Sequence, residues 1–287
     1  MGMDPLRTGY KARDKVFDAF RTYCQSIPND ASFIIRERQR LLRENGFSED
    51  DAYKMQSTLS DAAYPNTVPT LFWTVYEIYS RTELLGMIRQ ELWTNAVTKS
   101  DDGFVLDVAP LQTECPTLLS AYQETQRTRH AQVAFRGVTE DTFLEQYLLK
   151  KGKYLHMPAK PIHKNPDLWD QPENFDPHRF NPTKADGKAR LSSSSFRAWG
   201  VPPHMCPARQ FASTEILILA ALLILRTDLS PVRGGWKQNL EVKAMEISTL
   251  PRPRNDVRLT VSEREDGRGS WSLGMGKGKM RISLASG

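Results

Sequence analysis

Apolar and polar side chains alternate with the period of an α-helix along much of the chain before residue 93. Residues 11–23, 31–43 and 82–92 carry apolar side chains three and four positions apart, with charged side chains on the other face. Asn45-Gly46 is typical of a helix end, and Ser48 before three acidic residues is typical of a helix start. The pattern therefore predicts a mainly helical first part of the chain.

The longest helical pattern runs from about residue 50 to residue 79 and contains Pro65. A proline inside such a pattern either kinks the helix and opens a gap in its hydrogen-bond ladder, or separates two helices. The local sequence favours neither interpretation. The polar residues Asn66 and Thr67 stand at this point. After this point, large apolar residues are spread around much of the helix circumference, which predicts a central, covered position in the complete fold. They are Phe72, Trp73, Val75, Tyr76 and Ile78.

The later pattern is more varied. Residues 94–115 are polar and read as irregular, whereas residues 116–129 predict a helix that Pro116 opens. A segment rich in Pro, Asp and Asn over residues 158–190 predicts little regular structure. Short alternating runs predict strands over residues 132–138, 142–144, 147–149, 154–157, 240–247 and 257–261, and an edge strand over 280–284.

Cys206 ends a loop rich in Gly and Pro, immediately before an almost wholly apolar helical run over residues 207–226. Pro207 suits the first helical position. The Cys206 sulfur is therefore expected at a helix N-terminus, where unpaired N–H groups favour a thiolate. Such a thiolate serves as a nucleophile, a redox thiol or an iron ligand. A buried structural cysteine is an equally good local interpretation.

Composition narrows the class of protein. With 39 Lys and Arg against 34 Asp and Glu, the net charge is only +5, and the basic residues are scattered. Nucleic-acid binding is therefore disfavoured, and a basic surface facing an acidic redox partner is compatible. The three cysteines are far apart and odd in number, which predicts a reducing, intracellular compartment. The apolar run Ile216–Leu225 is too short for a membrane span, so these residues predict no anchor.

A charged motif lies on the helix predicted over residues 116–129. Glu124 and Arg127 are three positions apart, which places both charges on one face. Taken alone, such a pair is usually a solvated surface bridge. A second arginine, Arg179, follows in Phe175-Asp-Pro-His-Arg179-Phe. With the Cys206 loop, these motifs in this order resemble the C-terminal half of a cytochrome P-450, a haem-thiolate monooxygenase.

The resemblance implies a fold and a division of the chain. The fold is mainly helical with a small β region, and its I, K and L helices fall near residues 50–79, 116–129 and 207–226. Residues 10–262 are expected to form the C-terminal haem-binding portion, followed by a Gly-rich tail over residues 263–287. Glu124, Arg127 and Arg179 are expected to form a buried structural network, because a carboxylate between two guanidiniums suits burial.

The same resemblance assigns haem-binding residues. Cys206 is implied as the proximal thiolate ligand of the iron in haem b. Arg136 and His204 stand where the family places side chains that bind the haem propionates. Trp199 occupies the aromatic position of the family's Phe-x-x-Gly-x-x-x-Cys-x-Gly loop. Pro202 replaces the first glycine of that loop, where glycine permits a tight bulged turn that proline cannot copy.

Asn66 and Thr67 occupy the oxygen-handling part of the family's long helix. Ala62-Ala-Tyr-Pro-Asn-Thr67 has Pro65 in place of the usual acid and Asn66 in place of the usual threonine. This segment resembles the branch that includes sterol 7-alpha-hydroxylases and prostacyclin synthase. The resemblance implies that Asn66 and Thr67 are catalytic residues on the distal face of the haem.

The implied activity is insertion of one oxygen atom from O2 into a small lipophilic substrate, sterol-like or otherwise apolar. An NADPH-dependent reductase would supply the electrons. The alternatives are a haem-thiolate isomerase that acts on a peroxide and a non-catalytic remnant without haem. Full-length relatives are membrane proteins of the endoplasmic reticulum, so membrane association is expected only of a full-length protein.

The resemblance also predicts an incomplete chain, because family members carry an anchor and several helices before the long helix. Without those helices, the large apolar residues after Pro65 are expected to lack cover on one side. Each such side chain left in water forgoes about 1.5–3 kcal/mol of burial. The sequence therefore predicts a truncated, aggregation-prone fragment with impaired activity.

Overall fold

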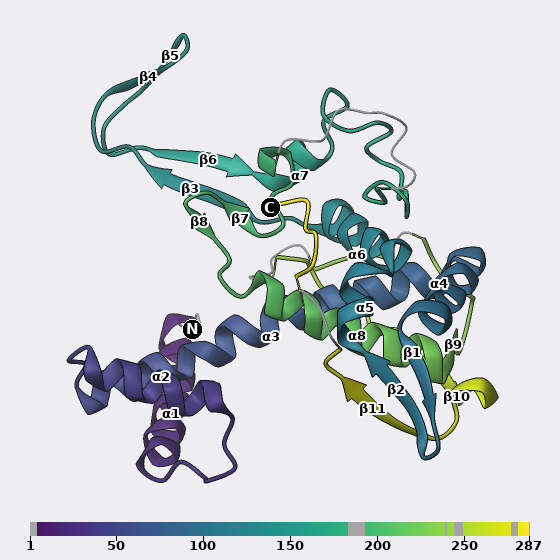
Figure 1. The fold of residues 1–287 in the computed structure, drawn as a ribbon. Helices are drawn as coiled ribbons and strands as arrows, with labels where there is room; N and C mark the ends of the chain where they lie inside the picture. The colour runs from purple at the N-terminus through teal and green to yellow at the C-terminus, as the bar shows by residue number, and fades with distance from the viewer. Residues whose placement is uncertain (1–4, 183–192, 239, 244–248, 277–280, 287) are drawn as a thin grey trace. The chain divides into compact units, whose positions relative to one another are not determined.

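A computed structural model describes residues 5–182, 193–238, 240–243, 249–276 and 281–286 of the chain. Helices make up about half of these residues, and the strands form small sheets (Figure 1). The chain divides into two compact units, residues 1–65 and 66–287, and the boundary lies within one helix. Each unit is described by itself.

Unit 1 is helical. It contains α1 (Pro5–Gln25), α2 (Phe33–Glu44) and the first part of α3 (Glu49–Tyr79). The backbone N–H of Asp51 donates to Ser48 Oγ at 3.1 Å, so the predicted capping serine is confirmed. Gln56 of α3 joins α2, because its amide donates to Ile35 O at 2.7 Å.

α3 is helical from Glu49 to Tyr79, so the two-helix interpretation of Pro65 is not what forms. Pro65 and Pro69 both lack an N–H, which leaves the carbonyls four residues earlier without their helical donors. Just beyond this gap, the Thr70 hydroxyl donates to Asn66 O at 2.6 Å and the Thr74 hydroxyl donates to Thr70 O at 2.8 Å. Such back-bonding hydroxyls often accompany bends in helices.

The second part of α3 is covered, and the expectation that its apolar residues lack cover is wrong. Trp73 and Ile78 are fully buried, and Phe72 is half-buried. The cover comes from α4 (Thr82–Asn95), from α8 (Arg209–Arg226) and from Trp236 and Leu250. The covering residues lie later in the chain, so the pattern of α3 alone did not reveal them.

The core of unit 2 lies among α4, α6 (Pro116–Arg129) and α8, which lie close together in Figure 1. Helix α6 has the predicted bounds, and α8 begins two residues later than predicted. Tyr122 of α6 and Ser213 of α8 share a buried hydrogen bond of 2.9 Å. Fully buried side chains of this core include Ile88, Leu92, Leu118, Ile216, Leu217 and Ile224.

Residues 94–115 form regular structure, which corrects the irregular prediction. β1 (Val97–Ser100) and β2 (Gly103–Asp107) are antiparallel, and α5 (Val108–Thr113) follows. The third strand of this sheet is β11 (Ser270–Gly274), which pairs parallel with β2. β11 is remote from β2 in sequence. The Phe104 ring of β2 stacks on the Trp271 ring of β11, with 4.9 Å between the ring centroids.

The segment expected as a Gly-rich tail therefore packs onto unit 2 over its described residues. After β11, Ile282 and Leu284 are buried in the core. Gln210 of α8 binds Ile282 twice, because its amide donates to Ile282 O at 3.1 Å and its Oε1 accepts from Ile282 N at 3.0 Å. Residues 281–284 form no strand, and the rest of the edge strand expected over residues 280–284 lies outside the described residues.

The remaining strands form two-stranded sheets. β3 (Val133–Gly137) pairs with β6 (Tyr154–Pro158), and β4 (Thr142–Leu144) pairs with β5 (Tyr147–Leu149), close to the predicted bounds. β9 (Thr227–Pro231), which the pattern missed, pairs with β10 (Leu259–Glu263). Residues 244–247 of the predicted strand 240–247 lie outside the described residues, and Val242 forms a single bridge with Pro253. Short helical segments are α7 (Ala159–His163), η1 (Ser193–Ser195) and η2 (Glu265–Gly267).

Candidate functional site

The loop before Cys206 is a tight antiparallel hairpin of β7 (Gly200–Val201) and β8 (His204–Met205). Gly200 has φ +87°, and a Cβ there would lie 2.8 Å from His204 O, so glycine is required at this position. Gly200 thus provides the positive φ that the hairpin needs. The hairpin forms although Pro202 stands in place of the family's glycine. The Cys206 N–H donates to Trp199 O at 2.8 Å and seats the cysteine at the hairpin base.

Cys206 is a free, half-buried thiol shortly before the start of α8. Arg209 Nη1 donates to Cys206 O at 3.2 Å, which fixes the cysteine backbone against the helix. The other two free cysteines are buried, and burial raises the pKa of the Cys24 and Cys115 thiols. Cys206 is therefore the cysteine whose sulfur is both accessible and close to a helix N-terminus.

A buried ion cluster lies behind this loop. Glu124 and Arg127 of α6 are both fully buried, and two parallel bonds of 2.7 and 2.8 Å join the carboxylate to the guanidinium. Arg179 Nε lies 3.1 Å from the same carboxylate, and the Asp176 N–H donates to it at 3.0 Å. The structure thus brings together the three charged residues of the motif. A bidentate pair with further donors is an arrangement that burial tolerates.

The ion cluster holds the long irregular segment in place. Arg127 Nη1 donates to two carbonyls of that segment, His163 O at 2.6 Å and Pro172 O at 2.8 Å. Arg179 Nη1 donates to Asp170 O at 2.7 Å. Because these donors come from two fixed guanidiniums, residues 164–182 follow a defined course without a helix or strand of their own, whereas the start of the segment forms α7.

His163 connects the ion cluster to the cysteine loop. Its Nδ1 lies 3.1 Å from Arg127 O, and its Nε2 accepts from the Arg197 backbone N–H at 2.9 Å. A neutral ring with the proton on Nδ1 satisfies both bonds. The ring is fully buried and stacks on Phe196 at 5.7 Å. His163 therefore fixes the chain just before Trp199.

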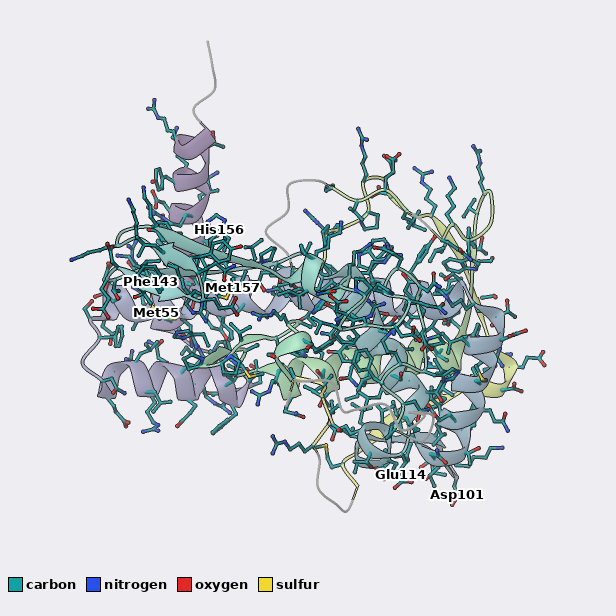
Figure 2. All side chains as sticks on the ribbon, turned by 90° about the horizontal axis from the view of Figure 1, so that it is seen from above. Met55, Asp101, Glu114, Phe143, His156 and Met157 are labelled. Atoms are coloured by element: carbon teal, nitrogen blue, oxygen red, sulfur yellow. The ribbon has the colours of Figure 1, made fainter. Side chains whose placement is uncertain are left out.

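Two arginines and two histidines line one cavity beside the hairpin. The cavity has a volume of about 130 Å³, and Arg136, Arg197, His204 and the buried His130 line it. Met157 of β6, labelled in Figure 2, also lines it. We call this space the cation cavity. A cavity with such donors fits carboxylate groups.

Two buried nitrogen atoms near the hairpin have no partner among the described residues, namely Trp199 Nε1 and His130 Nδ1. Buried polar atoms are usually hydrogen-bonded, so orphaned atoms at this position are compatible with a ligand that the chain itself does not supply. Burial lowers the pKa of His130 to about 4 and that of His163 to about 3. Both rings are therefore neutral near pH 7.

These two histidines predict acid lability of unit 2. Their usual pKa is 6.5, and it is lowered in the folded state, so the unfolded chain takes up protons that the folded chain does not. Stability is therefore lost as the pH falls from 6.5 toward about 3 to 4. Between pH 7 and pH 5 we expect the unfolding free energy to drop by about 3–4 kcal/mol.

Urea unfolding at a series of pH values measures this drop, and His130→Gln is the informative variant. It should remove about half of the pH dependence in that window. An unfolding free energy of the parent chain that stays constant between pH 7 and pH 5 would contradict the prediction.

Asn66 and Thr67 lie half-buried on α3, just after Pro65. The Asn66 side-chain oxygen accepts a hydrogen bond from the Thr249 backbone N–H at 2.9 Å, and its backbone carbonyl accepts from Thr70. The described hydrogen bonds of Asn66 therefore lead to the 249 region, and none joins it to the Cys206 hairpin.

Sequence reasoning missed three residues of this site. Arg197 and His130 line the cation cavity, and His163 links α6 to the hairpin. The available signals were weak: His130 follows the Glu124–Arg127 helix directly, and Arg197 precedes Trp199 by two residues. Neither position belongs to the motifs on which the resemblance rests.

The amino-acid sequence is similar to known proteins along most of its length. The model of the cytochrome P450 family matches residues 14–257. The chain is 32% identical to cytochrome P450 monooxygenase nodJ of Hypoxylon pulicicidum, over 99% of this chain and 58% of that protein. It is 28% identical to a cytochrome P450 monooxygenase of Gibberella zeae, over 80% of this chain and 46% of that protein.

A mammalian protein is also similar. The chain is 27% identical to the 25-hydroxycholesterol 7-alpha-hydroxylase of Rattus norvegicus, over 70% of this chain and 52% of that protein. The chain belongs to the cytochrome P450 family, a class of haem-thiolate oxidoreductases. It spans about half the length of these curated relatives. Among the described residues, no helix combines the length and the apolar character that crossing a membrane requires.

The cofactor of the family is haem, and the residues of this site fit it. A free thiol near a helix N-terminus suits an iron ligand. Carboxylate groups such as the haem propionates suit the cation cavity, where His130 Nδ1 has no partner among the described residues. The side chains that suit the iron and those that suit the propionates thus come from one hairpin and its neighbours.

Proposed function

We propose that residues 10–262 form the C-terminal haem-binding portion of a cytochrome P450 monooxygenase, with residues 263–287 as a following segment. The observation that carries the proposal is the Cys206 hairpin, which lies between α8 and the cation cavity. β11 and the buried Ile282 indicate that part of the following segment supports this portion instead of hanging free.

The residues of the site divide into those that bind haem and those that support the hairpin. Cys206 would provide the thiolate ligand of the iron, and Trp199 O accepts the Cys206 N–H and so orients the cysteine. Arg136, Arg197 and His204 bind the propionates. Bound haem supplies the iron at which oxygen is activated for insertion. Glu124, Arg127 and Arg179 fix the segment that leads to the hairpin and touch no substrate.

The proposed substrate is a small lipophilic molecule, sterol-like or otherwise apolar. The support is the similarity to relatives whose names specify sterol hydroxylation, such as the rat 25-hydroxycholesterol 7-alpha-hydroxylase. Asn66 and Thr67 are proposed to line the distal side, where their side chains would hydrogen-bond oxygen or water. An NADPH-dependent reductase is the proposed electron donor, and the endoplasmic reticulum membrane is the proposed location of a full-length protein.

The carbon monoxide difference spectrum of the reduced, haem-reconstituted chain tests this proposal. We expect a Soret band typical of thiolate ligation, because Cys206 is accessible and supported from both sides. Bovine serum albumin treated with haem in the same way is the control for unspecific uptake. Absence of haem uptake would contradict the proposal and favour the non-catalytic remnant.

A second candidate function is haem-thiolate isomerisation of a peroxide. Asn66, which stands in place of the family's usual threonine, favours it. An isomerase needs neither a reductase nor free oxygen, so turnover of an endoperoxide without NADPH would separate the two activities. Turnover that requires NADPH, reductase and oxygen would support the monooxygenase.

A further inference from the structure

One face of α3 carries a row of four polar or aromatic residues, two of which bind the backbone of a later segment. Asn66, Thr70, Trp73 and Glu77 recur at intervals of four, three and four residues, so they share one face of the helix. Three of them are buried and Asn66 is half-buried. The Trp73 indole N–H donates to Pro251 O at 2.9 Å. We call these four residues the α3 row.

The α3 row holds residues 249–251 at both ends. Asn66 Oδ1 accepts from the Thr249 N–H at 2.9 Å, and Trp73 binds the carbonyl two residues further on. Between these two bonds, Leu250 is 1% exposed and packs against Trp73. The backbone of this segment is thus bound by two side chains seven residues apart on one helix.

The other side of the 249–251 segment is fixed as well. The Ala131 N–H donates to Thr249 O at 2.9 Å, so both polar backbone groups of Thr249 are bound. Ala131 follows His130, which lines the cation cavity. Arg129 Nε donates to Glu77 at 2.9 Å, and its guanidinium lies 4.0 Å over the Trp73 ring, so the α3 row is tied to the end of α6.

We propose that Asn66 is a positioning residue, whose amide oxygen fixes the 249–251 segment against α3. The inference rests on the proposed function, because it revises the role of Asn66 as a direct hydrogen-bond partner of distal oxygen. Turning the Asn66 amide away from Thr249 would leave a partly buried N–H without its acceptor, which folded proteins avoid.

Amide hydrogen exchange of the full chain tests the acceptor role directly. Asn66→Ala removes the oxygen, and we expect exchange at the Thr249 amide to become about tenfold faster, as the loss of one hydrogen bond implies. Asn66→Asp retains an acceptor oxygen and should stay within about twofold of the parent chain. Asn95→Ala, which removes another helix side chain that binds a backbone carbonyl, is the matched control.

Two further controls keep the outcome clear. Exchange at the amides of α8 reports whether a variant is folded, and it should not change. Unchanged Thr249 exchange in a folded Asn66→Ala chain would overturn the proposal. So would equally fast exchange in Asn66→Asp and Asn66→Ala, because the oxygen would then not be the relevant group.

A spectroscopic measurement separates positioning from direct contact. In the haem-loaded, reduced chain with carbon monoxide, an amide N–H that reaches the distal ligand would change the C–O stretching frequency. We expect Asn66→Asp, which lacks the amide N–H, to leave that frequency unchanged. A shift in Asn66→Asp would overturn the proposal. Failure to take up haem would count against the proposed function alone, because exchange at Thr249 is measured without haem.

Discussion

Cys206→Ser is expected to abolish the thiolate-type Soret band of the reduced, carbon monoxide-bound chain completely. The hydroxyl of serine does not ionise near neutral pH, so it cannot replace the anionic sulfur that the site offers to iron. The hairpin itself should persist, because the bond from the residue 206 N–H to Trp199 O is a backbone bond. The fold and the ligand are therefore separable in this variant.

The other two cysteines provide matched controls for that experiment. Burial raises the pKa of both thiols, so neither supplies a thiolate near pH 7. Cys24→Ser and Cys115→Ser should accordingly retain the spectrum of the parent chain, provided that circular dichroism shows them folded. A thiolate-type band in Cys206→Ser, or its loss in a folded Cys115→Ser chain, would show that the ligand has been assigned to the wrong residue.

Glu124→Gln is expected to lower the free energy of unfolding by about 3–5 kcal/mol, because one partner of a fully buried ion cluster is removed. The fully buried Arg127 and the partly buried Arg179 would then lack their compensating charge. Equilibrium unfolding in urea, followed by circular dichroism, measures the change. A loss of this size approaches the whole margin of many domains, roughly 5–15 kcal/mol.

An exposed pair of the same spacing gives the control. Glu37 and Arg40 of α2 are also three residues apart and form a bidentate contact, but both are solvent-exposed or half-exposed. Glu37→Gln should therefore leave the unfolding transition nearly unchanged. If the two substitutions shift the transition equally, burial is not what gives the Glu124 cluster its importance.

Helices and motifs could be predicted from the sequence because their signals are local. The bounds of α3 and α6 follow from apolar spacing within each segment, and the three-residue spacing of Glu124 and Arg127 places them on one helix face. The strands β3 to β6 follow from alternation over a few residues. In each case the information lies within one or two turns of chain.

The remaining features depend on partners far along the chain. The parallel pairing of β11 with β2 was missed because the two strands lie more than 160 residues apart in the chain. The cover of Trp73 was missed because Leu250 provides part of it, and the acceptor role of Asn66 was missed because Thr249 is remote. Arg197 lines the cation cavity, and its backbone is bound by His163, which lies 34 residues earlier. None of these pairings leaves a periodic signal.

The two hydrogen bonds between Gln210 and Ile282 have a consequence for biosynthesis. These residues are separated by 72 positions, so Gln210 leaves the ribosome well before its partner exists. At about 5–20 residues per second, the delay is roughly 4–14 seconds. During that interval the first turn of α8, just after Cys206, lacks one of its anchors. The helix turn that follows Cys206 should therefore reach its final set of hydrogen bonds only after residue 282 has been translated.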